Sequence, residues 1–385
     1  MDLKQVTETG ESTLRKKRVL LLSEGFGAGH TQAAYALSSS LRKLSPRVQT
    51  RVLELGNFLN PRMAPLIVSA YRKTVTAQPR LMGYVYRHQK SFNRLTTLAL
   101  HRIFYTHTKN IVRQLRPDIV VCTHFIPGAV VSRLKRIDPK FNMPLVTVIT
   151  DYDAHASWIS PEVDRYLVST PEVKSKLRRA GVAAGKIRVT GIPVHPNFWE
   201  HPGRNEILLQ FNLQDMPTVL VMGGGWGLMN DEVVNAVLAG WRDQVQIIFC
   251  LGHNEKLLQE MTEDPLYNHP NITLIGFTRE IDKLMEISDL LVTKPGGMTC
   301  SEGLAKGIPM LFHNPLPGQE EENCRYLTNA GFGETIDSPE VVGKWIHRLL
   351  HHYEEVRQQR KNHLEAIARY HPLESAQSIL EMLDL

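Results

Sequence analysis

The chain has 385 residues, more than one hydrophobic core usually holds, so two domains of roughly 200 residues each are expected. Its 42% of apolar and 22% of charged residues, with a formal net charge of +6, exclude a disordered or fibrous protein. No stretch reaches the roughly 18 uninterrupted apolar residues of a membrane-spanning helix, and the polar first residues do not resemble a secretory signal, so a cytoplasmic protein is expected.

The first half of the chain alternates short apolar runs with segments of helical composition. Residues 18–23 predict a buried parallel strand, and after a glycine-rich turn residues 31–44 predict a helix and residues 48–55 a second strand. Further buried strands are expected at residues 119–124, 145–150, 165–169 and 187–190. Strands that alternate with helices predict a parallel sheet with helices on both faces.

A second series of the same kind follows residues 193–203, where prolines and glycines cluster and predict a linker. Its strands are expected at residues 218–222, 246–251, 272–276, 290–293 and 308–312. Residues 339–385 are mostly helical in composition, with Pro372 as the clear interruption. The sequence therefore predicts an α/β fold of two doubly wound, Rossmann-like domains that face a central cleft.

The loops that follow the strands are the expected place for chemistry, because ligands of such sheets bind outside the carboxyl ends of the strands. After the first strand, residues 23–30 read Ser-Glu-Gly-Phe-Gly-Ala-Gly-His. Gly29 allows a close backbone approach, and His30 at the start of the following helix is a candidate general base. A simple tight turn explains the glycines equally well, and their spacing is not the dinucleotide fingerprint.

The loop after residues 145–150 carries Asp151, His155 and Trp158. Two acids, a histidine and a tryptophan at a strand end predict an acceptor site, and the alternative is a surface Asp–His contact.

Two glycine-rich loops of the second domain also lie between a strand and a helix. Residues 222–227 contain Gly224 and Gly225, and a loop wrapped around phosphate is favoured there over a merely flexible one. In residues 294–303 a helix is expected to begin near Thr299, so that its backbone donors face the cleft. Thr299 and Glu302 fit a capping box, but Glu302 could instead accept hydrogen bonds from a ribose diol, and the sequence favours neither.

Residues 315–323 place three successive acids at the start of a helix, between Gln319 and Asn323. Carboxylates there gain from the helix dipole, and the same residues also suit the recognition of sugar hydroxyls. The two interpretations are close.

A one-sided distribution of charge marks residues 56–117, which hold 11 Lys or Arg residues and no Asp or Glu. Such a stretch suggests an anionic partner, either nucleic acid or a membrane surface. Basic and aromatic side chains mix in residues 63–75 and 81–104, which favours an interfacial membrane segment over a solvated basic helix face. The residues chosen for this contact are Arg72, Lys73, Tyr84 and Arg87.

No metal site is expected. The four cysteines lie far apart without a Cys-x-x-Cys pair, which excludes a disulfide framework and a zinc knuckle. His347 and His351 lie four residues apart on an expected helix but lack a third ligand.

Four of these segments, in this order, resemble one family. They are Gly27-Ala28-Gly29-His30, Thr150-Asp151 with His155 and Trp158, Thr293-Lys294-Pro295-Gly296-Gly297, and Pro317-Gly318-Gln319-Glu320-Glu321-Glu322-Asn323. The chain resembles the bacterial diacylglycerol glucosyltransferases and the plant monogalactosyldiacylglycerol synthases. Their wider group includes the peptidoglycan enzyme that transfers N-acetylglucosamine to a lipid.

The resemblance implies a GT-B fold and an inverting, metal-independent transfer of a hexose from a UDP-sugar, with UDP-glucose as the first choice. The implied acceptor is diacylglycerol or a glycosyl-diacylglycerol at an anionic membrane surface, with the enzyme peripheral on the cytoplasmic face. No cofactor is implied beyond the UDP-sugar co-substrate, and no nucleic acid. We divide the chain into a flexible segment (1–17), an acceptor- and membrane-binding domain (18–197), a UDP-sugar-binding domain (198–370), and a C-terminal helix (371–385) that packs back on the first domain.

The resemblance also assigns roles to single residues. His30 is the first choice for the base, with Asp151 or His155 as alternatives, and Trp158 belongs to the acceptor site. Glu302 would hold the ribose, and the backbone around Phe277 would meet the uracil. The remaining donor-binding residues are Gly29, Gly224, Gly225, Gly296, Gly297, Met298, Thr299, Gln319, Glu322 and Asn323. Trp226 is bulkier than the family pattern suggests, which leaves the identity of the donor open.

Three alternative functions remain. A UDP-sugar 2-epimerase shares the fold and the donor loops but has no use for a basic, aromatic insertion in the first domain. A nucleic-acid-binding or membrane-scaffold protein with a decayed site would not be expected to keep His30, Glu302 and Gln319 together. A glycosyltransferase with a different hydrophobic acceptor is a third possibility.

Overall fold

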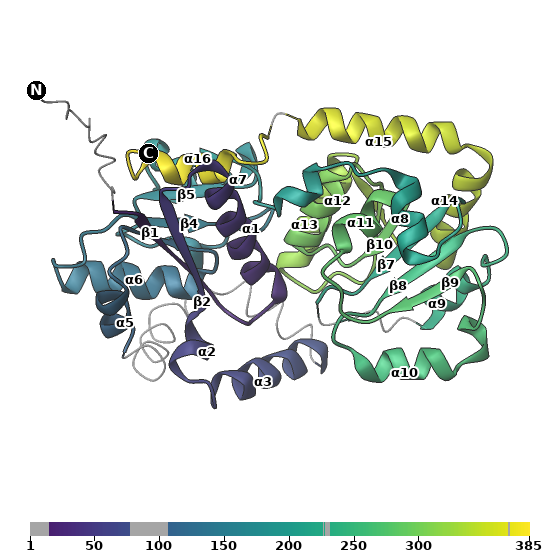
Figure 1. The fold of residues 1–385 in the computed structure, drawn as a ribbon, viewed down its shortest axis with the longest axis horizontal. Coiled ribbons are helices and arrows are strands. Elements are labelled where there is room, and N and C mark those ends of the chain that lie inside the picture. Colours follow the sequence, from purple (N-terminus) through teal and green to yellow (C-terminus); the bar gives the residue numbers. More distant parts are fainter. Residues whose placement is uncertain (1–14, 78–106, 226, 228–231, 369) are drawn as a thin grey trace, which may run out of the picture.

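A computed structural model describes residues 15–77, 107–225, 227, 232–368 and 370–385, with the backbone alone from residue 71 to residue 77. It contains two α/β domains side by side (Figure 1). None of the helices described in these ranges is long and apolar enough to cross a bilayer.

The first domain is built on a parallel sheet of six strands in the order β2-β1-β3-β4-β5-β6. These strands are β1 (Lys17–Ser23), β2 (Val48–Glu54), β3 (Ile119–Cys122), β4 (Leu145–Val148), β5 (Arg165–Val168) and β6 (Ile187–Val189). The helices of this domain are α1 (Ala28–Leu44), α2 (Leu55–Leu59), α3 (Ala64–Ala77), α5 (Thr108–Leu115), α6 (Phe125–Ile137) and α7 (Pro171–Arg179). All six strands expected from the sequence are confirmed.

The second sheet has the order β12-β11-β10-β7-β8-β9 and is also parallel throughout. Its strands are β7 (Thr218–Met222), β8 (Gln246–Cys250), β9 (Ile272–Ile275), β10 (Leu290–Thr293), β11 (Met310–Phe312) and β12 (Gly333–Thr335). The helices are α8 (Arg204–Phe211), α9 (Glu232–Ala239), α10 (Glu255–Glu263), α11 (Ile281–Ile287), α12 (Gly297–Ala305), α13 (Gln319–Asn329), α14 (Pro339–His351) and α15 (Tyr353–Ile367). The edge strand β12 was not predicted, because three half-buried residues that begin with glycine give no apolar signal.

Both sheets are covered on their two faces. Along β1, Val19 and Leu21 belong to the core on one face, and Leu20 and Leu22 to the core on the other. Successive side chains of a strand point to opposite faces, so a continuous apolar run gives a sheet that is buried on both sides.

The chain passes between the domains twice. It first crosses through residues 190–203, and after α15 it returns so that α16 (Glu374–Glu381) packs on the first domain beside α1 (Figure 1). Ala376 and Ile379 join the core of that domain, and the Ser375 hydroxyl donates to Thr190 Oγ1 at 2.9 Å. The last helix is therefore part of the first domain.

Each sheet has one point where the strand order reverses. In the first sheet it lies between β1 and β3, and in the second between β7 and β10. Loops that leave such a pair of strands run to opposite faces and open a crevice between them. The loops after these four strands are therefore where ligands are expected.

Candidate functional site

The two domains contact each other closely at two glycines of the second domain, next to the points where the strand order reverses. A Cβ atom built on Gly297 would lie 2.0 Å from the Thr150 carbonyl oxygen, and one built on Gly225 would lie 2.7 Å from the Ala28 Cβ. These glycines lie in or next to loops that follow β10 and β7, and they face Thr150 after β4 and Ala28 at the start of α1. The domains are therefore closed on each other, at contacts too close for a larger residue.

His30 lies in the first turn of α1, next to the crevice of the first sheet. Its Nδ1 lies 3.1 Å from the Thr123 carbonyl oxygen and 2.7 Å from Thr150 Oγ1. Because a carbonyl oxygen only accepts, Nδ1 carries the proton in the neutral ring, and the lone pair is on Nε2. Burial lowers the pKa of His30 to about 4, against the opposing effect of the Thr123 bond. The ring is therefore neutral at pH 7 and able to accept a proton at Nε2.

His124, which the sequence analysis did not select, packs edge-on against His30 with ring centroids 4.7 Å apart. Its Nδ1 accepts from the Ile126 amide at 3.2 Å at the start of α6, so its proton is on Nε2. Burial holds the pKa of His124 well below its usual range, with the charges of His30 and His155 acting in the same direction. At Nε2, His30 thus offers a hydrogen-bond acceptor and His124 a donor. Its place at the end of β3 was the signal that could have found His124.

His155 and Trp158 complete this aromatic group, with ring centroids 5.9 Å apart. Burial lowers the pKa of His155 to about 4. Trp158 is only 2% exposed, and its Nε1 has no hydrogen-bond partner among the residues that the structure describes. A buried N–H group without a partner is costly, and it is suited to bind a ligand oxygen.

Asp151 lies directly after Thr150 and faces the second domain. Its Oδ1 accepts from Asn323 Nδ2 at 3.2 Å, and the Gln319 side chain also bonds to this carboxyl. Burial nevertheless raises the pKa of Asp151 to about 6. The candidate residues Asp151, Gln319 and Asn323, far apart in sequence, are thus brought together across the cleft.

Helix α12 begins at Gly297, two residues before the expected start at Thr299. Gly296 is the N-cap, and no described side chain caps the helix. The capping-box interpretation of Thr299 and Glu302 is therefore wrong, because Thr299 is already inside the first turn. The first backbone N–H groups and the positive end of the helix dipole face the cleft beside Met298, whose side chain approaches Gly29.

Glu302 lies one turn further along α12. Burial raises the pKa of its carboxyl to about 8, and the nearby Asp282 acts in the same direction. A carboxyl whose pKa is raised in this way by burial is a candidate for a binding role.

Two of the three acids at the start of α13 accept hydrogen bonds from backbone amides of the loop that precedes the helix. Glu320 Oε2 accepts from the Leu316 amide at 2.8 Å, and Glu321 Oε2 accepts from the Gly318 amide at 2.9 Å. Glu322 forms an ion pair with Arg325. The loop is therefore fixed by its carboxylates, and Gln319 at the start of the helix bonds to Asp151 of the first domain.

Phe277 follows β9 and is 51% exposed. Its ring stacks on His253, with centroids 4.3 Å apart and planes 12° from parallel. The His253 amide donates to the Gly225 carbonyl at 3.3 Å, so this stacked pair lies beside the glycine-rich loop that also contains Gly224.

Some candidates lie outside what is described. Tyr84, Arg87 and Trp226 are outside the described residues, and Arg72 and Lys73 lie on α3 where the backbone alone is described. Within the described ranges no group of three or more His, Cys, Asp or Glu side chains could hold a metal ion, and the four cysteines are free and buried.

Two family models match the chain in succession. The model described as monogalactosyldiacylglycerol (MGDG) synthase matches residues 30–194, and the glycosyltransferase family 28 C-terminal domain matches residues 218–379. The chain is 30% identical over 343 residues to the processive diacylglycerol beta-glucosyltransferase of Staphylococcus aureus, a match that covers 87% of this chain and 85% of that relative.

Solved structures share the whole architecture. Anabaena HepE in complex with UDP-glucose is 15% identical, with a TM-score of 0.60 over 95% of this chain and 99% of that one. The UDP-GlcNAc 2-epimerase of Neisseria meningitidis is 14% identical, with a TM-score of 0.57 over 95% of this chain and 99% of its own. These likenesses confirm the expected GT-B fold, and the fold by itself does not separate a transferase from an epimerase.

Proposed function

This chain belongs to the family of monogalactosyldiacylglycerol synthases and processive diacylglycerol glucosyltransferases, and from that premise we propose that it transfers glucose from UDP-glucose to diacylglycerol or a glycosyl-diacylglycerol. It is a UDP-sugar-dependent glycosyltransferase that makes glycolipid. The observation that carries the proposal is the position of His30, a neutral base at one crevice, opposite the uncapped start of α12 at the other.

The donor diphosphate binds at the start of α12 in this proposal. Backbone N–H groups and the helix dipole stabilise negative charge there, and the charge on the leaving diphosphate grows in the transition state. Gly224 and Gly225 supply a second loop that can approach the phosphates closely, and no metal ion or other cofactor is needed. The uracil would lie at the loop of Phe277.

The acceptor hydroxyl gives its proton to His30 Nε2 as its oxygen attacks the anomeric carbon. Attack opposite the departing UDP inverts the configuration at this carbon in a single displacement. Trp158 Nε1–H and His124 Nε2–H are donors to other oxygens of the acceptor, such as ester carbonyls or sugar hydroxyls. His155 and Asp151 remain alternative bases.

UDP binding should release a proton below about pH 8, and this release should disappear in Glu302→Gln. The two hydroxyls of a ribose can both donate only to an ionised carboxylate, whereas the pKa of Glu302 is raised to about 8 in the free protein. Bound UDP therefore favours the anion, and the affinity for UDP should rise as the pH rises toward 8. Isothermal titration at pH 7, in buffers with different ionisation enthalpies, measures the released proton.

Asp282→Asn is the second variant for this experiment. Removing the neighbouring charge lowers the pKa of Glu302, so less proton should be released at pH 7 while UDP still binds. Undiminished proton release in Glu302→Gln would show that another group meets the ribose.

Action at a membrane surface is supported by apolar side chains on α2, on α3 and in the turn between them. Phe58, Met63 and Leu66 are 46%, 51% and 64% exposed, at the start of the acid-free stretch. Exposed apolar residues next to basic ones are typical of segments that lie in the interface of an anionic bilayer. On this proposal the enzyme works from the cytoplasmic face.

Leu66→Ser should weaken binding to anionic vesicles by roughly 10- to 150-fold, because about 1.5–3 kcal/mol is lost when a leucine is no longer buried in lipid. Co-sedimentation with phosphatidylglycerol-containing vesicles measures the change. Leu209→Ser is the matched control, since Leu209 is 84% exposed on α8 of the second domain. Equal effects of the two substitutions would mean that this part of the surface does not contact lipid.

Lipid-dependent release of UDP tests the function itself. The assay offers UDP-glucose, UDP-galactose and UDP-N-acetylglucosamine in turn, with and without diacylglycerol in anionic vesicles. Release from UDP-glucose that requires diacylglycerol, together with a glucosylated lipid product, supports the proposal. Release without lipid favours the epimerase or another acceptor.

A further inference from the structure

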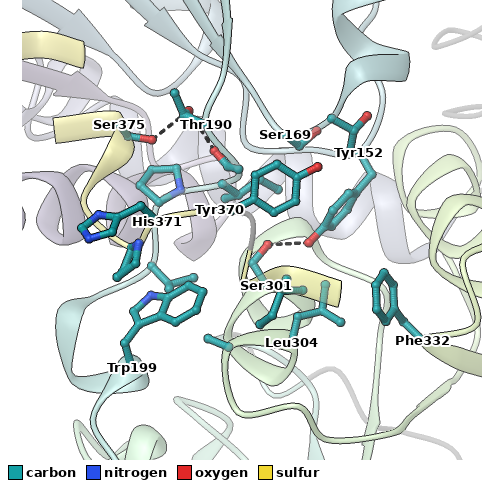
Figure 2. Close-up of a pocket in the computed structure, with 18 of the residues that line it drawn as sticks. Tyr152, Ser169, Thr190, Trp199, Ser301, Leu304, Phe332, Tyr370, His371 and Ser375 are labelled. Atoms are coloured by element: carbon teal, nitrogen blue, oxygen red, sulfur yellow. Dashed lines mark hydrogen bonds between the residues drawn. The ribbon is translucent and has the colours of Figure 1, made fainter. Parts of the chain in front are cut away.

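A pocket lies at the two crossings of the chain between the domains (Figure 2). Residues 190–194 and Trp199 line it from the first crossing, and residues 370–372 line it from the return. Helix α12 presents Leu304 to this pocket, whereas Glu302, on another face of the helix, does not line it. None of the residues proposed above to bind the donor or the acceptor lines it either. The pocket is therefore a separate site.

The walls of this pocket carry aromatic rings in place of charges. None of the described residues that line it is an Asp, Glu, Lys or Arg. The rings of Tyr152, Trp199, Phe332 and Tyr370 lie around the space instead (Figure 2). A charged ligand would lose its water shell there and gain no partner of opposite charge from these walls. The pocket thus excludes UDP-sugars and phosphates, and it favours an uncharged molecule with an aromatic face.

Several hydroxyl groups on the walls already donate to protein atoms. Ser301 donates to the backbone carbonyl four residues before it at 2.6 Å, so the Tyr152 O–H is the donor in its 2.8 Å bond with Ser301 Oγ. Ser375 donates to Thr190 Oγ1 at 2.9 Å, and Thr190 donates to the next backbone carbonyl at 3.2 Å. Because these protons are used within the protein, the interior of the pocket offers mainly apolar contacts.

His371 provides a polar group at the edge of the pocket. Its side chain lines the pocket and is exposed to solvent. Its Nδ1 accepts from the Leu373 amide at 3.2 Å just before α16, so the proton of the neutral ring is on Nε2. This N–H group can donate to an oxygen of a ligand whose ring lies further inside.

The pocket faces away from the segment proposed to contact the membrane. It adjoins α16, whereas α3, which carries the exposed Leu66, lies on the opposite side of the first domain (Figure 1). A ligand therefore enters from solution and not from the bilayer. The free space is about 50 Å³, which is room for roughly four water molecules or for one six-membered ring.

We propose that this pocket binds a small uncharged molecule with a single aromatic ring and an oxygen that accepts from His371 Nε2, and that the bound molecule holds the two domains in this arrangement. Both domains and both crossings supply the walls, so a ligand makes all of its contacts only in this relative position of the domains. A ligand that binds one arrangement better than another shifts the population toward it. The inference goes beyond the proposed function and does not require turnover.

Benzyl alcohol is the probe for this site, and benzoate is the charged analogue of nearly the same size. Ligand-observed NMR titration of the full chain without lipid should give a Kd of about 1 mM or below for benzyl alcohol. Benzoate should bind at least about tenfold more weakly. Saturating benzyl alcohol should also slow hydrogen exchange at both crossings by about threefold or more, because the crossings open less often.

His371→Asn should weaken the binding of benzyl alcohol by about threefold or more, because the Nε2–H donor is lost while asparagine can still accept from the Leu373 amide. Ala305→Leu fills the pocket and should weaken binding by more than about tenfold. His351→Asn is the matched control, because His351 is exposed at the end of α14. Melting curves show whether each variant is folded.

The proposal is overturned if benzoate binds as tightly as benzyl alcohol, or if His371→Asn and Ala305→Leu both bind benzyl alcohol as the His351→Asn control does. Exchange that slows elsewhere but not at the crossings would place the ligand at another site and also overturn it. Absence of lipid-dependent UDP release from the wild type would contradict the proposed function alone, since neither the titration nor the exchange measurement depends on transfer.

Discussion

His30→Ala should lower the rate of glucosyl transfer by about 10²–10⁴-fold and leave UDP binding within a few fold. The imidazole is held by Thr123 and Thr150 with its lone pair on Nε2, and alanine removes the only group there that we expect to take the acceptor proton. UDP is proposed to bind to the other domain, so its affinity has no reason to change. Initial rates with diacylglycerol vesicles and titration with UDP measure the two quantities separately.

His155→Ala is the comparison for this substitution. His155 belongs to the same aromatic group and its pKa is also lowered to about 4, so its loss disturbs the acceptor site without removing His30. We expect a smaller decrease in rate. Substantial activity in His30→Ala together with inactivity of His155→Ala would exchange the roles of the two histidines.

The pH dependence of kcat/KM for the acceptor, measured with saturating UDP-glucose so that the ionisation of Glu302 does not limit donor binding, distinguishes Asp151 from either histidine. A base must be deprotonated, so the rate falls as the pH drops below its pKa. Burial raises the pKa of Asp151 to about 6 and lowers that of His30 to about 4. With His30 as the base the profile should stay level from about pH 8 to about pH 5, whereas a tenfold decrease per pH unit below about 6 would identify Asp151.

Gly297→Ala should lower the rate of transfer by about 100-fold without lowering the melting temperature of the protein. The added Cβ would lie 2.0 Å from the Thr150 carbonyl oxygen, so the domains could not close fully. Alanine is otherwise favourable at a helix start that has an ordinary backbone conformation. Misplacement of reacting groups by about 1 Å can reduce a rate by that factor.

Gly203→Ala is the matched control for this prediction, because a Cβ at Gly203 meets nothing within 4 Å and its φ is −61°. Rates with saturating UDP-glucose and melting curves of both variants give the comparison. If Gly297→Ala were as active as Gly203→Ala, the closed arrangement would not be the one in which transfer occurs.

The sequence predicted the elements and the loops of the site well, because both follow from local patterns. Buried parallel strands are continuous apolar runs, and β7 and β10 begin and end where the runs do. The loops after β1, β7 and β10 were singled out by their glycines. The order of the strands explains why ligands are expected at these loops, because the loops follow strands that flank the points where the strand order reverses.

What the sequence could not predict depends on distance in three dimensions. The bonds of Asn323 to Asp151 and Tyr152 join residues more than 170 positions apart in two domains. Local sequence patterns do not determine the relative orientation of two domains. The start of α12 was placed at Thr299 because Thr-x-x-Glu is a capping signal, whereas Pro295 and Gly296 already supply a turn that begins the helix at Gly297. The sequence placed His124 inside the strand predicted at residues 119–124, whereas β3 ends at Cys122 and leaves His124 in the loop after it.

The return of α16 to the first domain makes that domain discontinuous in sequence. The described residues of 15–77 and 107–189 form one domain with α16, and the segment from α8 to α15 is inserted between β6 and α16. Cuts at the two crossings would therefore remove the second domain, which we propose binds the donor, as a complete module. Chimeras between relatives with different sugar preferences should be joined at both crossings, because a single junction would pair α16 with an α1 and a β5 from another protein.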